Sequence, residues 1–266
     1  MKENKHSKNK KLTSGIKILL ILLCTIIGSY GIATAPESDQ SMLEQELQQN
    51  AKTLEDMEQN DLSQDGDHPS LILETPEATD QDNPSLSTLS PAVTEQPAEI
   101  ISVIGDSVFL GAAPDYQKLV PNAVIDAKIS RQVYQALDVA KKLDKKGKLG
   151  NTVLIALGTN GKFNEVTGQE LIDYLGKDRR IYWITAYGKK LSWQKEVNQT
   201  IKKLAEKNEN VSVIAWAKEA KKHPNWFYQD GTHLNTKGQA GFAKFIVKKV
   251  QAQQLALQEF ALQILG

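Results

Sequence analysis

Five short, nearly continuous apolar runs place the strongest constraint on how this chain folds. They are rich in β-branched residues, and helical stretches separate them. The runs are IISVIG (100–105), AVIDAK (123–128), NTVLIALG (151–158), RIYWITA (180–186) and NVSVIAW (210–216). Such runs are typical of strands that are buried on both faces, as in a parallel sheet covered by helices. We therefore predict an α/β fold, a three-layer α/β/α doubly wound sandwich whose five-stranded parallel sheet is flavodoxin-like.

The stretches between the runs carry apolar residues at helical spacing. One such stripe, in residues 131–143, consists of Val133, Leu137, Ala140 and Leu143. The last helix is expected to begin at Thr236, where Gln239 three residues on suits a capping box. We expect one globular domain in residues 99–252, followed by a C-terminal helical tail in residues 253–266.

The formal net charge of zero hides three regions of different charge. Residues 1–17 carry six lysines against Glu3, and residues 36–99 carry sixteen Asp and Glu against Lys52, a net charge of −15. Residues 100–266 carry twenty-five Lys and Arg against fifteen Asp and Glu, a net charge of +10. These lysines are spread along helix faces and no nucleic-acid motif appears, so we expect no nucleic-acid partner. A basic surface outside a cell suits anionic wall polymers.

An uncharged segment follows the basic start. No charged residue lies between Ile18 and Ala35, a length that spans a bilayer core of ~30 Å if Lys17 snorkels. By the positive-inside rule, the lysines place residues 1–17 in the cytoplasm and the rest of the chain outside. We therefore expect residues 18–35 to be a single-pass transmembrane anchor. The alternative is a signal segment and a secreted protein, since Ala33-Thr34-Ala35 resembles a cleavage site.

Residues 36–98 are rich in Gln, Asp, Glu, Ser, Thr and Pro and contain almost no aromatic residues. Such a composition buries too little apolar surface to offset chain entropy, so we predict an acidic disordered linker that lifts the domain off the membrane. One part has helical spacing, with Leu43, Leu47, Leu54 and Met57 near a and d positions. Two heptads are too few to indicate a coiled coil.

Cysteine and histidine usage argues against a metal centre. Cys24 is the only cysteine, so no intramolecular disulfide is possible. The four histidines, His6, His68, His223 and His233, show no metal-ligand spacing. We expect neither a metal nor a cofactor.

Polar segments with glycine follow the strands at their carboxyl ends. They are GDSVFLGA, KISRQ, GTNGKF, TAYGKKLSW and, after the fifth strand and one intervening segment, YQDGTHL. Function in open α/β sheets gathers at that edge, so we expect these segments to meet there.

Ser107 stands at the turn between the first strand and the next helix, where backbone N–H groups and the helix dipole favour negative charge. A serine hydroxyl needs a base before it acts as a nucleophile. His233 is the only histidine expected on this edge with a carboxylate close by, and Asp230 would orient its imidazole. Gly231 lets the turn between them fold tightly. We therefore predict that Ser107, His233 and Asp230 are catalytic.

Other residues are candidates to support this chemistry. The Asn160 side-chain amide and the backbone N–H of Ser107 and of Ser130 would form the oxyanion hole. Tyr187 and Trp226 are candidates for substrate binding. Each feature also has a structural reading, because serines cap helices and glycine-rich segments form turns. Their order along the chain favours the catalytic reading.

These residues, in this order, resemble the blocks of the SGNH, or GDSL-type, hydrolases. GDS with Ser107 resembles block one, GTN with Asn160 block three, and DGTH with Asp230 and His233 block five. Within that superfamily, GDSVFLGA, IDAKISRQ, LGTNG and DGTHLN are similar to the extracellular domain of the Gram-positive peptidoglycan O-acetyltransferases. The resemblance covers about residues 100–250 and implies the same triad and oxyanion hole.

The chain departs from the family pattern at two points. Many SGNH enzymes have glycine at block two, where this chain has Ser130 with its N–H retained. Full-length acetyltransferases of the family join this domain to a multi-span membrane acyltransferase, whereas this chain has one span at most. The resemblance implies O-acetyl transfer to a cell-wall glycan, with a separate multi-span acyltransferase or another donor supplying acetyl. A carbohydrate acetylesterase and a non-catalytic cell-wall binding protein are the alternatives.

Overall fold

The structure is a computed structural model that describes residues 38–64 and 99–265. Contacts divide the chain into one unit that ends at Met42 and a second from Leu43 to Gly266. In the first unit the described residues open helix α2 (Asp39–Gln64), where Ser38 Oγ accepts a hydrogen bond from the Ser41 N–H at 3.1 Å. All other elements lie in the second unit.

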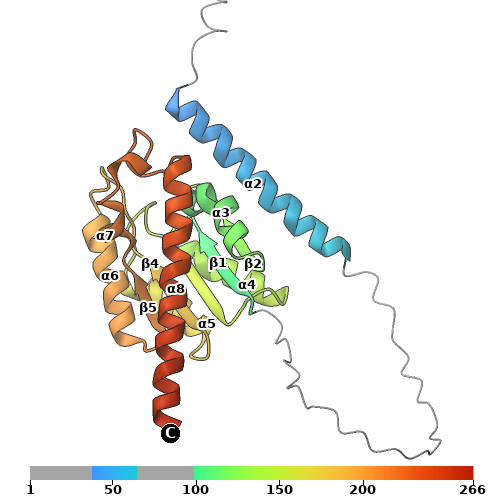
Figure 1. Cartoon of the computed structure of the whole chain (residues 1–266), viewed down its shortest axis with the longest axis vertical. Coiled ribbons are helices and arrows are strands. Elements are labelled where there is room, and N and C mark those ends of the chain that lie inside the picture. The colour runs from blue at the N-terminus through green and yellow to red at the C-terminus, as the bar shows by residue number, and fades with distance from the viewer. Residues whose placement is uncertain (1–37, 65–98, 266) are drawn as a thin grey trace, which may run out of the picture. The chain divides into compact units, whose positions relative to one another are not determined.

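Five parallel strands form the sheet, as the apolar runs predict (Figure 1). They are β1 (Ile101–Gly105), β2 (Ala123–Ala127), β3 (Thr152–Ala156), β4 (Arg180–Ile184) and β5 (Val211–Ile214). Their order in the sheet is β2-β1-β3-β4-β5. This is the flavodoxin-like order, which reverses direction at β1 and leaves a crevice at the carboxyl ends of the neighbouring strands.

Helices cover both faces of this sheet (Figure 1). On one face lie α3 (Ser107–Leu119), the short α7 (Trp216–Ala220) and α8 (Thr236–Leu265), and on the other α4 (Ala136–Lys145), α5 (Glu165–Leu175) and α6 (Gln194–Lys207). Two short 3-10 turns, Val133–Gln135 and Pro224–Trp226, precede α4 and the loop before α8.

The alternation of strand side chains explains why one sheet carries two cores. Along β3, Val153 and Ile155 belong to the core beneath α4, α5 and α6, whereas Leu154 and Ala156 belong to the core beneath α3 and α8. All four are buried. A strand with both faces covered must be apolar at every position, which is why the sequence shows continuous runs here.

The start of α8 corrects one expectation. Thr236 is the first helical residue, as predicted, but Asn235 makes the cap, because its Oδ1 accepts a hydrogen bond from the Gly238 N–H at 3.1 Å. Gln239 does not complete a capping box. Its amide donates instead to the Leu234 carbonyl at 3.0 Å and to Glu46 at 2.5 Å.

The predicted disordered linker is wrong for residues 39–64, which form α2. The helix is stable because it does not stand alone: Leu43 and Leu47 are buried against Leu110 of α3. The rest of the predicted linker and the expected membrane segment, residues 65–98 and 18–35, lie outside the described residues.

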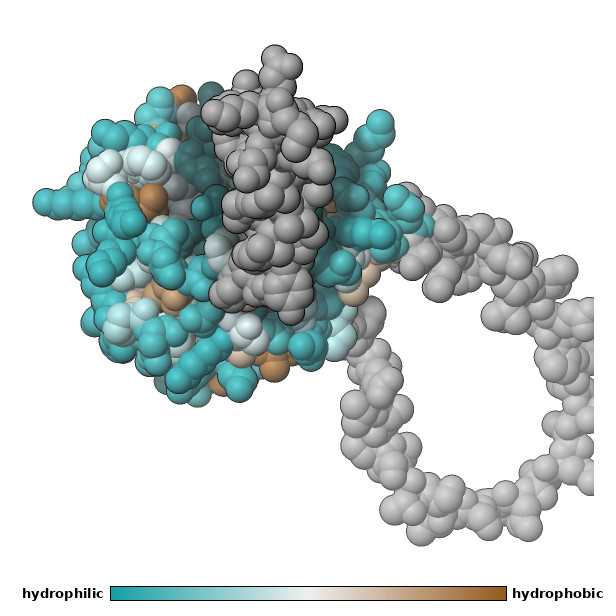
Figure 2. Space-filling view, turned by 90° about the horizontal axis from the view of Figure 1, so that it is seen from above, coloured by the Kyte–Doolittle hydropathy of each residue, from teal (hydrophilic) through white to brown (hydrophobic). Residues whose placement is uncertain are grey.

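Neither 38–64 nor 99–265 contains a helix long and apolar enough to cross a bilayer. Within the same two stretches, no group of three or more His, Cys, Asp or Glu side chains is placed to hold a metal ion. The face seen in Figure 2 is largely hydrophilic, with apolar side chains scattered over it.

Candidate active site

The register of the sheet brings three strand ends to the same level. Gly105 at the end of β1 is paired with Ala127 of β2 and with Ala156 of β3. The segments that follow, 106–107, 128–131 and 157–160, therefore leave the sheet side by side. They carry Ser107, Ser130 and Asn160, so the sheet itself delivers three of the predicted residues to one place.

Ser107 is the first residue of α3, directly after β1. Asp106 caps the helix: its Oδ1 accepts a hydrogen bond from the Val108 N–H at 3.0 Å. Gly105 must be small here, because a Cβ would lie 2.8 Å from the Phe109 Cβ. The Ser107 N–H belongs to the first turn of the helix, where backbone donors have no partner within the helix.

Asp106 is buried and links two of the converging segments. Its second carboxylate oxygen accepts a hydrogen bond from the Thr159 hydroxyl, next to Asn160. Burial raises the pKa of the Asp106 carboxyl, against the opposing effect of the hydrogen bonds from Thr159 and Val108. Asp106 therefore joins the start of α3 to the segment after β3 through Thr159, a residue that sequence reasoning missed.

A narrow loop before α8, residues 227–234, holds the other two predicted residues. Phe227 and Leu234 form an antiparallel bridge at its base. The Tyr228 N–H donates to the His233 carbonyl, and the Gly231 N–H donates to the Tyr228 carbonyl, each at 2.9 Å. Gly231 has a φ of 69°, a left-handed conformation that glycine adopts without strain. The tight turn that the sequence predicts is therefore present.

Asp230, His233 and Ser107 form a hydrogen-bonded line. The Asp230 Oδ2 lies 2.5 Å from the His233 Nδ1, and the His233 Nε2 lies 2.9 Å from the Ser107 Oγ. The serine is 5% exposed, and the aspartate and histidine are partly exposed. In this spatial order, the imidazole can accept the proton of the hydroxyl while the carboxylate stabilises the imidazolium that forms.

Asp230 is held as a carboxylate. Burial raises its pKa, but the hydrogen bonds it accepts from the His233 side chain and from the backbone N–H of Thr232 and His233 outweigh that effect, so the pKa is lowered. The two backbone bonds, at 2.8 and 3.0 Å, both reach Oδ1 and leave Oδ2 for the imidazole.

Ser130 occupies a strained position in the turn after β2. Its φ is 60°, in the left-handed region, and the Arg131 N–H closes the turn by donating to the Lys128 carbonyl at 3.3 Å. A turn of this kind favours glycine at its third residue. The Asn160 amide donates to the Arg131 carbonyl at 3.3 Å, so Asn160 and the residue after Ser130 are joined.

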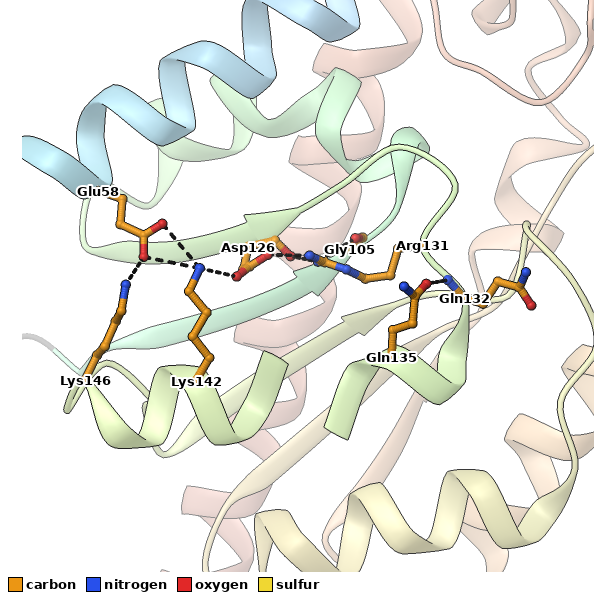
Figure 3. A network of polar contacts seen from close by, with 8 residues as sticks. All are labelled: Glu58, Gly105, Asp126, Arg131, Gln132, Gln135, Lys142 and Lys146. Atoms are coloured by element: carbon orange, nitrogen blue, oxygen red, sulfur yellow. Dashed lines mark hydrogen bonds and ion pairs between the residues drawn. The ribbon is translucent and has the colours of Figure 1, made fainter. Parts of the chain in front are cut away.

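Arg131 is a buried residue of this site that the sequence did not assign (Figure 3). Its guanidinium donates to the Gly105 carbonyl at 3.1 Å and pairs with the Asp126 carboxylate at 2.5 Å. Lys142 of α4 approaches the same carboxylate at 3.4 Å. Arg131 therefore fixes the turn with Ser130 to the end of β1, two residues before Ser107. A single buried arginine does not change the periodicity of a sequence. The only indication of its role is that it lies in KISRQ, the segment after the second strand.

The two aromatic candidates lie in different surroundings. Tyr187 lines a small pocket beside Asp106 and Thr159, together with Trp216 and Phe242. Trp226 does not line that pocket: its ring stacks on His223 at 3.8 Å and lies against Gly241 of α8, and its backbone lies against Gly238. The structure gives Trp226 a packing role, and its part in substrate binding stays a prediction.

Several curated proteins resemble this chain, among them two that are named O-acetyltransferases. Over 150 residues it is 35% identical to the O-acetyltransferase OatA of Staphylococcus aureus (strain NCTC 8325 / PS 47). The match covers 56% of this chain and 24% of OatA. Over 155 residues it is 32% identical to YrhL of Bacillus subtilis (strain 168), which is provisionally named a peptidoglycan O-acetyltransferase. That match covers 58% of this chain and 24% of YrhL. The chain thus spans about a quarter of the length of these curated relatives. No protein-family model matches it.

A solved structure resembles the fold. The C-terminal catalytic domain of Streptococcus pneumoniae peptidoglycan O-acetyltransferase A, solved with a methylsulfonyl adduct, superimposes with a TM-score of 0.53 at 26% identity. The match covers 59% of this chain and 95% of that domain. The comparisons confirm the resemblance to the peptidoglycan O-acetyltransferases that the sequence motifs indicate.

Proposed function

We propose that this chain is a serine-dependent O-acetyltransferase that acts on peptidoglycan or another cell-wall glycan. The observation that carries the proposal is the line from Asp230 through His233 to Ser107, with contacts of 2.5 and 2.9 Å between segments far apart in the sequence. The similarity to the O-acetyltransferases OatA and YrhL supports the choice of an acetyl group and a glycan acceptor.

The first half-reaction loads the serine. The Ser107 Oγ attacks the carbonyl carbon of an acetyl donor while the His233 Nε2 takes its proton, and Asp230 stabilises the imidazolium. The oxygen of the tetrahedral intermediate is met by the backbone N–H of Ser107 and of Ser130 and by the Asn160 amide. Collapse breaks the bond to the donor's oxygen, which leaves with the proton from His233. Acetyl-Ser107 remains.

The second half-reaction transfers the acetyl group from Ser107 to the acceptor. A sugar hydroxyl gives its proton to the His233 Nε2 and attacks the acetyl carbonyl. The Ser107 Oγ then leaves and takes the proton back, which restores the free enzyme and forms the glycan ester. Water in place of the sugar would give acetate, so an acetylesterase uses the same residues and differs only in the acceptor. No cofactor takes part in either step.

The cellular setting of the reaction is a further part of the proposal and rests on the sequence of residues 1–35. We propose that residues 18–35 anchor the protein in the cell membrane, with residues 1–17 inside and the domain outside, and secretion after signal cleavage is the alternative. A separate multi-span membrane acyltransferase would then supply acetyl groups from the cytoplasmic side.

A direct test uses the full-length protein with 4-nitrophenyl acetate as donor and a short N-acetylglucosamine-based glycan as acceptor. We expect mass spectrometry to show glycan that has gained acetyl groups, and no gain with Ser107→Ala. Free acetate without acetylated glycan would instead assign an esterase on these substrates. If neither product forms above the Ser107→Ala background, the catalytic proposal fails and a wall-binding role takes its place.

A further inference from the structure

Helix α2 belongs to the acidic region before the domain, yet one of its side chains completes the hydrogen bonding of α3. Pro114 lies inside α3 and has no N–H, so the Leu110 carbonyl four residues earlier lacks its helical donor. The buried Asn50 of α2 supplies one: its Nδ2 donates to the carbonyls of Leu110 and Gly111, each at 3.2 Å. This specific pairing, beside Leu43 and Leu47, fixes where α2 docks.

Glu46, one turn before Asn50, reaches the loop of residues 227–234. Its Oε2 accepts a hydrogen bond from the Tyr228 hydroxyl at 2.9 Å, and its Oε1 accepts one from the Gln239 amide at 2.5 Å. Glu46 and Tyr228 are partly buried and Gln239 is 4% exposed. Shielding from water makes such charge-assisted hydrogen bonds stronger than those on an open surface.

Both partners of Glu46 hold an end of that loop. The Tyr228 backbone bonds to His233 and to Gly231, and the Gln239 amide also donates to the Leu234 carbonyl at 3.0 Å. One carboxylate of α2 therefore ties together the residues on either side of Asp230 and His233. The hydrogen bonds of this link end on the loop and on α8.

We propose that Glu46 is a positioning residue for the loop of residues 227–234, and that α2 is part of the catalytic unit rather than of a spacer. The proposal rests on the proposed function, since positioning matters only if His233 activates Ser107. Its consequence is that loss of the Glu46 carboxylate loosens the 2.9 Å approach of His233 to Ser107. A displacement of about 1 Å between reacting groups costs up to ~100-fold in rate.

The test measures how fast Ser107 reacts with methanesulfonyl fluoride in the full-length chain, by intact mass over time. In this reaction the Oγ forms a bond to sulfur, fluoride leaves, and His233 takes the proton. We expect Glu46→Ala to slow labelling roughly tenfold, within the limit for a misplaced base. Glu46→Gln, which keeps one acceptor oxygen, should restore part of the rate.

Two further variants separate positioning from general stability. Tyr228→Phe removes the hydroxyl that Glu46 accepts, so it should slow labelling too, and the double variant Glu46→Ala/Tyr228→Phe should be no slower than Glu46→Ala. Asp56→Asn removes a charge from an exposed position of the same helix and should label at the wild-type rate. Wild-type labelling of Glu46→Ala, or slowing that multiplies in the double variant, would overturn the proposal.

Failure of the proposed function gives a different result. If wild-type Ser107 is not labelled at all, the nucleophile itself is wrong. Hydrogen exchange of residues 228–234 then decides the positioning separately. Faster exchange in Glu46→Ala than in Asp56→Asn supports a hold on the loop, and equal exchange refutes it.

Discussion

Asp230 does two things with its two carboxylate oxygens. Oδ1 accepts the backbone N–H of Thr232 and of His233 and so shapes the turn, whereas Oδ2 faces the imidazole of His233. One side chain therefore both holds the turn and places a negative charge beside the imidazole. A substitution that keeps an oxygen at the Oδ1 position and removes the charge separates these two roles.

Asp230→Asn is that substitution. The turn should survive with a loss of about 1 kcal/mol of stability, since the backbone bonds can persist. The amide would face the His233 Nδ1 with the wrong hydrogen-bonding group, and kcat for ester turnover should fall by roughly 10³–10⁴. Steady-state kinetics with 4-nitrophenyl acetate measure this, and thermal melts check the fold. A fall below tenfold in a folded variant would mean that Asp230 does not orient the base.

Asp106 gives a pH-dependent prediction. Because burial raises its pKa, the folded state holds the proton more tightly than the unfolded state, and the carboxyl contributes most stability below its unfolded pKa of about 4. That contribution is lost as pH rises through the folded pKa. Asp106→Asn imitates the protonated acid, with one acceptor for Val108 and one donor toward Thr159.

The melting temperature of wild type minus that of Asp106→Asn should therefore fall as pH rises from about 4 toward neutrality. Differential scanning calorimetry over that range measures the difference in one buffer series. Asp230 is present in both proteins, so its own titration cancels. A difference that stays constant or grows with pH would show that the carboxylate is the better-stabilised form.

At the scale of elements, α2 shows what a composition argument misses. Its residues are mostly polar, and an isolated helix of this kind is only marginally stable in water. Beside the apolar contacts of Leu43 and Leu47, polar contacts fix it: Asn50 donates to two carbonyls, and Glu46 accepts from a tyrosine and a glutamine. Such contacts depend on partners some sixty residues and more away, so no local pattern in residues 39–64 reveals them.

A second attachment of α2 lies on the surface. Glu58 pairs with Lys142 at 3.3 Å and with Lys146, and Lys142 also faces Asp126 (Figure 3). The side chains of the two lysines are 46% and 29% exposed, and that of Glu58 is 36% exposed. Exposed pairs are screened by salt and contribute little, so the apolar contacts of Leu43 and Leu47 matter more for docking.

Leu47→Ala tests the docking of α2. Leu47 is 5% exposed against Leu110, and its loss should weaken docking by about 2–3 kcal/mol. Hydrogen exchange by mass spectrometry should show α2 amides exchanging at least ~30-fold faster, since 1.4 kcal/mol is tenfold, with the strands little changed. Gln48→Ala, at the next and exposed position, is the matched control. Equal protection of α2 in both variants would refute the docking described here.

At the scale of the whole molecule, the sequence predicts the sheet well and the additions to it poorly. Continuous apolar runs and their spacing are local signals of buried parallel strands, so β1 to β5 lie where the runs predict. Ser107, Asn160, Asp230 and His233 were predicted as site residues because their motifs stand in a recognisable order along the chain, and the structure brings Asp230 and His233 to Ser107. Arg131, Thr159 and Glu46 were not, because their roles come from contacts across the fold rather than from position in a motif.

The docking of α2 changes which residues would connect the catalytic unit to the proposed anchor. Leu43 already packs on α3, so only residues 36–42 separate the proposed anchor from the catalytic unit. The connection predicted from composition, residues 36–98, is therefore replaced in this respect by the seven residues 36–42.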